Sequence, residues 1–258
     1  MKITFLGTGT SQGVPVIGGS RSKLDLKNPK NWRTRTSAHI EIAGLHVQID
    51  ASPEMRLQCI YNNITWVDLF ILTHGHADHI AGMDDLRRFC DVIDGNVLPV
   101  YSNDYGIERI QAMFPYALDS RPRSSGYPCF KVRKIPDVLE LTDTARIHAI
   151  NLPHGPVKTL GLIFEEDDKK IAYFTDCKML SKRAIELAKN ADILAIDALR
   201  PMPHPSHICV EEAIAYTKEI DPNVSYFTHT TAQLDYGVWE PLLPSPCHMA
   251  YDGLSLEI

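Results

Sequence analysis

The sequence predicts an α/β protein in which short buried strands alternate with helices. Apolar runs rich in branched and large side chains, such as residues 67–72, have the length and composition of buried strands. Stretches with apolar residues at helical spacing follow several of them, as in residues 83–89 and 210–220. Polar residues that can bind metal stand where several of these strands end, so we expect the functional site along one edge of the strand layers.

The first half of the chain is expected to be mostly strands. They cover residues 2–6, 38–42, 46–49, 67–72 and 97–101, with helices near residues 55–60, 83–89 and 105–114. The strands at 38–42 and 46–49 form a hairpin around Ala43 and Gly44. Residues 18–36 are a polar insertion, and residues 120–127 form a loop rich in Pro, Gly and Ser, of the kind that often carries substrate contacts.

A second half is expected to start near residue 131. Its strands are expected at residues 147–152, 159–164, 170–174, 192–196 and 224–228, and its helices at 181–190 and 210–220. Residues 242–258 are expected to form a turn and a last strand, which favours a simple closing hairpin.

The composition argues against a nucleic-acid-binding, secreted or membrane protein. The chain has 258 residues and a net charge of −6, so it has no global basic field to attract nucleic acid. No signal-peptide pattern opens the sequence, and no apolar run is long enough to cross a membrane. The six cysteines contain no Cys-x-x-Cys pair, which indicates reduced thiols and a cytoplasmic protein.

The densest group of metal-binding side chains is Thr-His-Gly-His-Ala-Asp-His-Ile-Ala-Gly at residues 73–82. It lies between a predicted strand and a predicted helix, and Gly75 permits a tight turn between two ligands. Imidazole and carboxylate ligands suit zinc, manganese or ferrous iron. Three histidines and one aspartate would crowd a single tetrahedral ion, so we expect them to be divided between two ions.

Further candidate ligands each follow the end of a predicted strand. They are His154, Asp176 and His229. One such residue alone would be interpreted as an ordinary turn residue. Together with residues 73–82, they are expected to converge on one metal site at the edge of the sheets. Cys177, beside Asp176, is interpreted as a packed small residue.

The His-x-His-x-Asp-His pattern after an apolar strand resembles the signature of the metallo-β-lactamase superfamily, over essentially the whole chain. The resemblance implies an αββα sandwich, with two mixed β-sheets flanked by helices. It implies a single domain over residues 1–258 with two pseudo-repeated halves, roughly 1–130 and 131–258. It also implies two divalent metal ions, zinc or manganese, with iron as a further candidate.

The same resemblance implies a role for each ligand position. The expected ligands of the first metal are His74, His76 and His154. Those of the second are Asp78, His79 and His229, with Asp176 as the bridging carboxylate. Asp50 matches an aspartate that lies beneath the metals, where it would fix the tautomer of a ligand imidazole. The alternative for Asp50 is a turn or helix-cap residue before Pro53.

Within the superfamily, the chain is similar to the PhnP-type cyclic phosphodiesterases. The similarity rests on the Gly-Thr-Gly opening at residues 7–9, the insertion at residues 18–36 and its Arg-x-Arg-x-Ser exit. Many members bind a structural zinc through cysteines in this insertion, but this chain has none there, so we expect that zinc to be absent. Arg33 and Arg35 are candidates to bind phosphate, and a solvated edge strand is the alternative. The small-residue loop that follows Gly7 could cradle an anion, or could be a simple turn.

The segment Pro-His-Pro-Ser-His at residues 203–207 is the remaining candidate for catalysis. In the phosphodiesterase branch a histidine near this position, outside the metal set, acts as general acid or holds phosphate. His207 matches best, and His204 is a weaker candidate for substrate binding; the alternative is two exposed histidines before a helix. Asp78 is a second candidate for moving the proton.

The expected function is therefore a metal-dependent hydrolase with a hydroxide bridging two metals, a phosphodiesterase for small cyclic phosphates or nucleotide-type diesters. The alternatives are an RNA-processing nuclease resembling the tRNA 3′-end endonucleases, a thioester or lactone hydrolase, and a non-enzymatic metal-binding partner module. The expected partner is a small phosphodiester substrate. Nucleic acid is not favoured and no membrane is expected, whereas the resemblance implies a homodimer.

Overall fold

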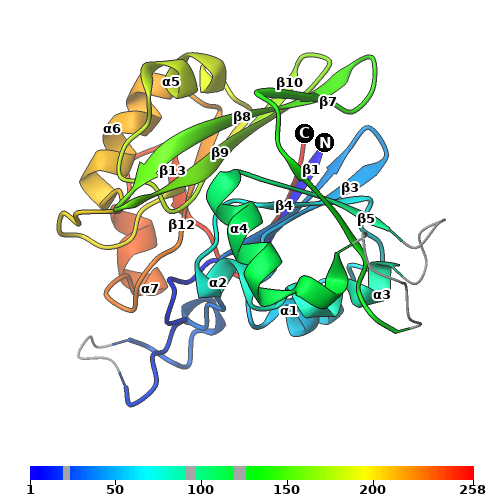
Figure 1. Ribbon diagram of the computed structural model, residues 1–258. Coiled ribbons are helices and arrows are strands. Elements are labelled where there is room, and N and C mark those ends of the chain that lie inside the picture. Colours follow the sequence, from blue (N-terminus) through cyan, green and yellow to red (C-terminus); the bar gives the residue numbers. More distant parts are fainter. Residues whose placement is uncertain (20–23, 91–96, 119–125) are drawn as a thin grey trace.

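The computed structural model describes residues 1–19, 24–90, 97–118 and 126–258 as two β-sheets packed face to face between helices (Figure 1). Each sheet has seven strands. Helices α5 and α6 lie outside one sheet, and α1 and α4 outside the other. The αββα sandwich expected from the sequence is confirmed. Residues 20–23 of the 18–36 insertion and most of the 120–127 loop lie outside the described residues.

The first sheet has the strand order β14-β1-β2-β3-β4-β5-β6. Its strands are β1 (Lys2–Gly7), β2 (Ser37–Ile42), β3 (Leu45–Ile49), β4 (Leu69–Leu72), β5 (Leu98–Ser102), β6 (Phe130–Lys134) and β14 (Ser255–Glu257). Pairing is antiparallel from β14 to β3 and parallel from β3 to β6. The associated helices are η1 (Pro29–Asn31), α1 (Met55–Tyr61), α2 (Ala77–Ile80), η2 (Met83–Leu86), α3 (Arg87–Cys90), α4 (Asp104–Met113) and η3 (Pro115–Ala117).

The second sheet has the strand order β13-β12-β11-β10-β9-β8-β7. Its strands are β7 (Val138–Glu140), β8 (Ala145–His154), β9 (Val157–Glu166), β10 (Lys169–Phe174), β11 (Ile193–Asp197), β12 (Val224–Thr228) and β13 (Cys247–Met249). Pairing is antiparallel from β7 to β10 and parallel from β10 to β13. The helices of this half are α5 (Lys182–Ala188), α6 (Val210–Ile220), α7 (Tyr236–Trp239) and η4 (Glu240–Leu242).

Strand β10 shows how the sequence builds the layers. Ile171 and Tyr173 enter the core between the two sheets, whereas Ala172 and Phe174 face the layer of α5 and α6. Because successive side chains of a strand point to opposite faces, a run that is apolar at every position fills two cores at once. Each such large side chain contributes about 1.5–3 kcal/mol through burial.

One expectation about the helices needs correction. The helix expected at residues 83–89 is a 3-10 helix, η2, followed by the short helix α3, while a separate helix, α2, begins inside the metal-binding segment. The two pseudo-repeated halves that meet roughly at residue 131 stay a prediction. In the structure β6 pairs with β5, and β14 returns from the end of the chain to pair with β1. Buried Phe130 anchors β6 beneath α4, and the two chain ends lie side by side, with the Met1 amino group donating to the Ile258 carbonyl at 3.0 Å (Figure 1).

No helix within the described ranges is both long enough and apolar enough to cross a bilayer.

A buried histidine network lies on the outer face of the first sheet, away from the expected metal ligands. His39 is 1% exposed; its Nδ1 donates to Gln48 Oε1 at 3.2 Å, and its Nε2 accepts from His46 Nδ1 at 3.0 Å. Burial, together with the neighbouring His46, lowers the pKa of His39 to about 4, against the opposing effect of the Gln48 hydrogen bond and Glu41. The ring is therefore neutral in the native protein near pH 7.

We expect His39 to make the fold sensitive to acid. Its pKa is lower in the folded than in the unfolded chain, so between about pH 6.5 and pH 4 the unfolded state binds more protons and stability falls on acidification. The loss attributable to His39 is expected to approach about 3 kcal/mol. Urea unfolding of metal-free wild type and His39→Gln at pH 7 and pH 4 would measure it. Equal losses in the two proteins would contradict this account.

Candidate active site

The candidate ligands gather where strands of both sheets end. Asp50 follows β3, Asp176 lies two residues after β10, and His229 follows β12. All three have left-handed backbone conformations, with φ of 59°, 52° and 57°. This conformation is unfavourable by about 1–2 kcal/mol for a residue other than glycine. Backbone strain is therefore concentrated around these side chains, as is common at functional sites.

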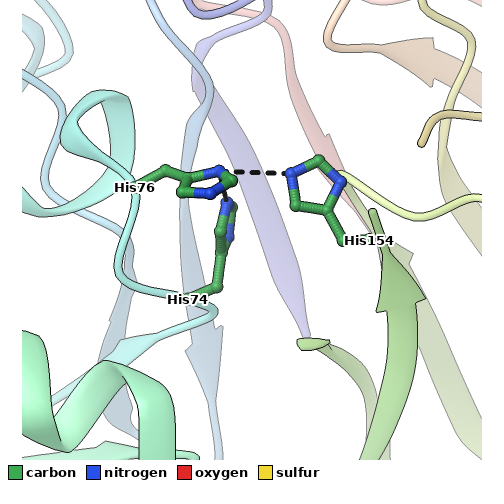
Figure 2. A group of neighbouring side chains, drawn as sticks. All are labelled: His74, His76 and His154. Carbon is green, nitrogen blue, oxygen red and sulfur yellow. Dashed lines mark hydrogen bonds between the residues drawn. The ribbon is translucent and has the colours of Figure 1, made fainter. Parts of the chain in front are cut away.

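Three histidines form the first group, His74, His76 and His154 (Figure 2). His76 Nδ1 lies 3.0 Å from His74 Nε2 and 3.2 Å from His154 Nε2. The opposite nitrogen of His154 donates to the Ser206 carbonyl at 3.1 Å, so its Nε2 has a lone pair. His74 Nδ1 lies 3.1 Å from Thr73 Oγ1, which likewise leaves the lone pair on Nε2. Three ring nitrogens thus converge with too few protons to satisfy one another.

The protonation of this first group suits metal binding. Burial lowers the pKa of His74 well below its ordinary value, and neighbouring histidines add to the effect. Burial also lowers the pKa of His154 to about 4 and lowers that of His76. Neutral imidazole is the form that coordinates a metal, so these rings are ready to bind without first losing a proton.

The second group consists of Asp78, His79, Asp176 and His229. His79 Nε2 lies 3.2 Å from an oxygen of Asp78 and 3.3 Å from one of Asp176. His229 Nε2 lies 3.0 Å from the other Asp176 oxygen. Both Nε2 atoms are buried and make no hydrogen bond, despite these short separations. Burial opposes charge on His79 and His229, but the carboxylates outweigh it, raising the pKa of His79 well above its ordinary value and that of His229 to about 8.

Asp50 fixes the orientation of His79 from below. Its carboxylate accepts from His79 Nδ1 at 2.7 Å and from the Thr73 backbone N–H at 2.7 Å, and it is fully buried. Because Nδ1 donates to Asp50, Nε2 is the nitrogen that faces the two carboxylates. The raised pKa of His79 keeps a proton on this nitrogen when no metal is bound, and a divalent cation would take the place of that proton. The hydrogen bond between Asp50 and His79 is the contact that the family resemblance implies for Asp50.

The two groups fit a pair of divalent cations. They provide converging imidazole nitrogens, an excess of buried carboxylate charge and the orphaned Nε2 atoms of His79 and His229. Asp176 contacts the second group through both of its oxygens, and one of them also belongs to a cluster with His154. The donor set of nitrogen and oxygen atoms suits zinc, manganese and ferrous iron alike. The seven side chains expected from the sequence are thus brought together.

His207 lies against these groups without belonging to either. Its ring stacks on His229, with centroids 4.8 Å apart and planes 9° apart, and meets the ring of His154 at 4.7 Å. Its Nδ1 donates to Asp197 Oδ2 at 2.8 Å. Asp197 is fully buried and also accepts the Cys177 backbone N–H at 3.2 Å. The pair is a histidine oriented by a carboxylate, an arrangement typical of proton-transfer sites.

Asp197 is the functional candidate that sequence reasoning missed. It is the last residue of β11, one position beyond the strand expected at residues 192–196. Its sequence position could have identified it, because an acidic residue that ends a wholly buried strand must have a partner.

A cavity of about 510 Å³ opens beside His207. It is lined by residues of three segments: Thr10, Ser11, Gln12, Val16 and Gly19; Leu199, Arg200, His204 and His207; and Thr231, Ala232 and Gln233. His204 therefore lies at the cavity, in contact with the ring of His207 at 5.1 Å between centroids. Its place is compatible with the expected role in substrate binding, which stays a prediction.

Arg33 does not fit the expected phosphate-binding role. It is 1% exposed, and its guanidinium donates to the carbonyls of Thr231 and Leu234 at 3.1 and 3.0 Å. The reason is that the insertion folds onto residues 231–235, where Asp235 accepts the side-chain amide of Asn31 at 2.7 Å. This buried network orders the described part of the insertion in place of a cysteine-bound zinc.

Arg35 lies at the surface of the same segment. Its guanidinium pairs with Glu54 and donates through Nε to the Ser11 carbonyl at 2.9 Å. It is not among the residues that line the cavity. Its phosphate-binding role therefore stays a prediction without a structural contact to support it.

Most backbone N–H groups of the glycine-rich loop after β1 form hydrogen bonds within the fold. The Gly9 and Thr10 N–H groups donate to the Thr34 and Thr230 carbonyls, and the Thr8 N–H donates to Asp252. A Cβ on Gly9 would lie 2.6 Å from the Arg33 carbonyl, so glycine is required for this close approach. The loop thus contacts the residue after His229 instead of offering these N–H groups to an anion. Asp252, which also accepts from Thr34 at 2.7 Å, clamps the loop from the C-terminal side.

Comparison with known proteins places the chain in a family. The model of the beta-lactamase superfamily domain matches residues 46–230. The chain belongs to the metallo-β-lactamase superfamily. A solved diphosphatase of the PhnP family is 30% identical, with a TM-score of 0.89 over 100% of this chain and 97% of that chain. The resemblance to the PhnP-type branch is thereby confirmed.

Two curated relatives extend the comparison. An octanoyltransferase of Porphyromonas gingivalis is 33% identical over 263 residues, covering 100% of this chain but 52% of the relative. A ribonuclease Z of Methanopyrus kandleri is 30% identical over 82 residues, 31% of this chain and 29% of that protein. The chain thus spans about half the length of the first relative, and a smaller share of the second.

We expect metal-stripped protein to take up two divalent ions per chain. Asp176→Ala is expected to retain at most one, because both Asp176 oxygens lie among the ligand atoms. Elemental analysis after reloading with manganese or zinc would measure this. Each occupied site should also stabilise the fold, by about 2.7 kcal/mol when free metal exceeds Kd a hundredfold. Asp137→Ala, which removes an exposed carboxylate paired with Arg183, is the matched control. Equal metal content in the two variants would contradict the assignment.

We expect Arg33→Met to act on stability. Loss of the buried guanidinium leaves the Thr231 and Leu234 carbonyls without donors, which should lower the free energy of unfolding by about 3 kcal/mol. Arg35→Met, the control two residues away, breaks a partly exposed ion pair and should lower it by about 1 kcal/mol or less. Urea denaturation of both variants would decide. Equal losses would mean that the buried network does not hold the insertion.

Proposed function

We propose that the chain is a dinuclear-metal-dependent phosphodiesterase that hydrolyses small cyclic phosphates or nucleotide-type diesters. The observation that carries the proposal is the Asp197–His207 pair, which stands beside the ligand groups and whose histidine lines the polar cavity. A metal-assisted hydrolase without a strong leaving group needs a proton donor at that place. The similarity to a diphosphatase of the PhnP family supports a phosphorus substrate.

The two ligand groups would hold the ions that this chemistry requires. His74, His76 and His154 would hold one, and Asp78, His79 and His229 the other, with Asp176 between them. When bound, such ions make water acidic enough to react near neutral pH and neutralise charge on phosphoryl oxygens.

Side chains of the protein would orient the ligands and transfer the proton. Asp50 holds the His79 ring in one tautomer and orientation. Asp197 accepts the hydrogen bond from His207 Nδ1–H and stabilises the ring when both nitrogens carry protons. His207 can then donate its Nε2 proton to the alkoxide oxygen that leaves phosphorus. Asp78, whose pKa is lowered because His79 and His229 outweigh its burial, stays ionised and suits ligand binding better than proton donation.

The competing hydrolase functions have less support. An eight-carbon acyl chain, as the name of the octanoyltransferase relative would suggest, needs an apolar groove. The cavity beside His207 is lined mainly by hydroxyls, amides, imidazoles and Arg200. An RNA substrate would favour a basic protein, whereas this chain has a net charge of −6. A homodimer, proposed from the family resemblance, is tested by light scattering.

We expect His207→Ala to discriminate between leaving groups. Manganese-loaded enzyme should hydrolyse both bis(p-nitrophenyl) phosphate and a 2′,3′-cyclic nucleotide. The variant should slow the cyclic nucleotide by about 10²–10⁴-fold, the usual contribution of a general acid. It should slow the nitrophenyl diester far less, because p-nitrophenolate leaves without protonation. Asp197→Asn should show the same pattern to a smaller extent.

The control for this experiment is His248→Ala, which removes a half-exposed histidine paired with Glu240, away from the ligands. It should leave both rates unchanged. Equal losses on both substrates in His207→Ala would remove His207 from proton donation. Absence of diester turnover by protein that holds two metals would contradict the phosphodiesterase function, and assays with RNA and a thioester would follow.

A further inference from the structure

The cavity beside His207 lies on the side where a leaving group would depart. Among its described lining residues, His207 contacts the rings of two candidate ligands, His154 and His229. A substrate whose phosphorus is held at the ligand groups, and whose leaving oxygen meets His207, therefore places its leaving alcohol in this cavity. The volume of about 510 Å³ falls within the usual range for small-molecule sites.

The chemistry of the lining is selective. Three hydroxyls come from Thr10, Ser11 and Thr231, and two amides from Gln12 and Gln233. Among the described lining residues there is no carboxylate, although the chain as a whole is acidic. There is also no Phe, Tyr or Trp among them, so the cavity lacks the flat apolar surface on which a nucleobase would stack.

Arg200 is the cation of this cavity. Its Nε donates to the Met202 carbonyl at 3.2 Å and one terminal nitrogen donates to the Pro203 carbonyl at 2.7 Å. These bonds fix the guanidinium to its own loop, and they leave further N–H groups for a ligand, since arginine has five. No carboxylate among the described residues forms an ion pair with it, in contrast to Arg35, Arg87, Arg146 and Arg183.

His204 adds a second donor to the same wall. Its Nδ1 accepts from the Ser206 N–H at 3.3 Å and lies 3.2 Å from Ser206 Oγ. A neutral imidazole that accepts at Nδ1 carries its proton at Nε2 and donates there. Arg200 and His204 together thus offer donors and no acceptor.

We propose that this cavity binds the leaving alcohol through an anionic group on it, a carboxylate or a phosphate, paired with Arg200. Arg200 is then a residue that determines specificity, and the preferred substrates are cyclic phosphates of short anionic alcohols, not nucleotides. The inference rests on the proposed function, because it identifies which phosphodiesters that function serves. A guanidinium held in place matches either anion through paired hydrogen bonds.

Three cyclic phosphates with the same ring test the proposal. Glycerol 1,2-cyclic phosphate has a neutral alcohol, its 3-phosphate has a phosphate, and glyceric acid 2,3-cyclic phosphate has a carboxylate. For wild type loaded with manganese, kcat/KM should be about tenfold or more higher for at least one anionic substrate than for the neutral one. The two anionic substrates show which anion the cavity accepts.

Arg200→Gln is expected to lower the ratio of anionic to neutral kcat/KM by about tenfold, and Arg200→Lys should restore part of it. A variant that merely displaced His207 would slow all three substrates together and leave the ratio unchanged. Arg146→Gln, which changes an exposed arginine of β8 paired with Glu165, is the matched control and should leave the ratio at its wild-type value. Calorimetric binding of glycerol 3-phosphate to metal-free protein should weaken by about tenfold in Arg200→Gln.

The outcomes separate this inference from the proposed function. Equal kcat/KM for all three substrates, or a ratio unaffected by Arg200→Gln, overturns the anionic subsite while diester turnover still supports the phosphodiesterase. Glycerol 3-phosphate that binds wild type and Arg200→Gln equally also overturns the subsite. Loss of binding in Arg200→Gln, with no turnover of any diester, overturns the proposed function and leaves Arg200 as an anion-binding residue.

Discussion

The site depends on the need to neutralise three carboxylates buried at the seam between the sheets, those of Asp50, Asp176 and Asp197. Each is at most 2% exposed, and an unpaired ionised carboxylate in such surroundings would be unfavourable by several kcal/mol. Each is met by histidine: Asp50 by His79, Asp197 by His207, and Asp176 by both His79 and His229. Burial keeps His74 and His154 neutral, and the raised pKa values of His79 and His229 supply less positive charge than these carboxylates and that of Asp78 carry negative charge. Divalent cations are the natural completion of such a set.

The topology explains why these side chains meet. In each sheet the second strand of a hairpin is followed by two parallel strands. In the first sheet β3 is followed by β4 and β5, and in the second sheet β10 is followed by β11 and β12. Asp50 comes after β3 and Asp176 after β10, both with left-handed backbone. The last residue of β11 is Asp197, while Thr73 and His74 follow β4. Because the carboxyl ends of parallel strands lie along one edge, two sheets packed face to face bring two such edges together.

Much of this could be predicted from the sequence, for identifiable reasons. Residues 210–220 were predicted as a helix because their apolar residues have helical spacing, and α6 spans Val210–Ile220. The metal-binding residues could be predicted because ligand chemistry restricts residue type, and because residues 73–82 carry four candidates together. The return of β14 to the first sheet could not be predicted in this way. A three-residue edge strand has too little periodicity to reveal its partner, which is fixed only by pairing with Lys2, Ile3 and Thr4.

The different roles of Arg33 and Arg200 could not be predicted from the sequence. Arg33 stands in a segment matched to a family of phosphodiesterases, yet its guanidinium is used on the carbonyls of Thr231 and Leu234. Arg200 stands in no such motif, yet it lines the cavity without a carboxylate partner among the described residues. The two side chains are chemically identical, and what separates their roles is which acceptors the folded chain brings within about 3 Å of each. Those acceptors are backbone carbonyls of loops, whose positions depend on long-range packing and carry no signature in residue type.

Strand ends hold the candidate ligands, whereas loops shape the cavity beside His207. The ligands are fixed to strand ends in a rigid sandwich, where small displacements would break several buried contacts at once. The cavity wall is made of three loops: the turn after β1, the segment that leads into α6, and the turn after β12. A change in one of these loops alters the lining without moving Asp176 or His229. A superfamily that keeps its strand ends and varies such loops can therefore keep its ligand positions and change the shape and lining of the adjoining cavity.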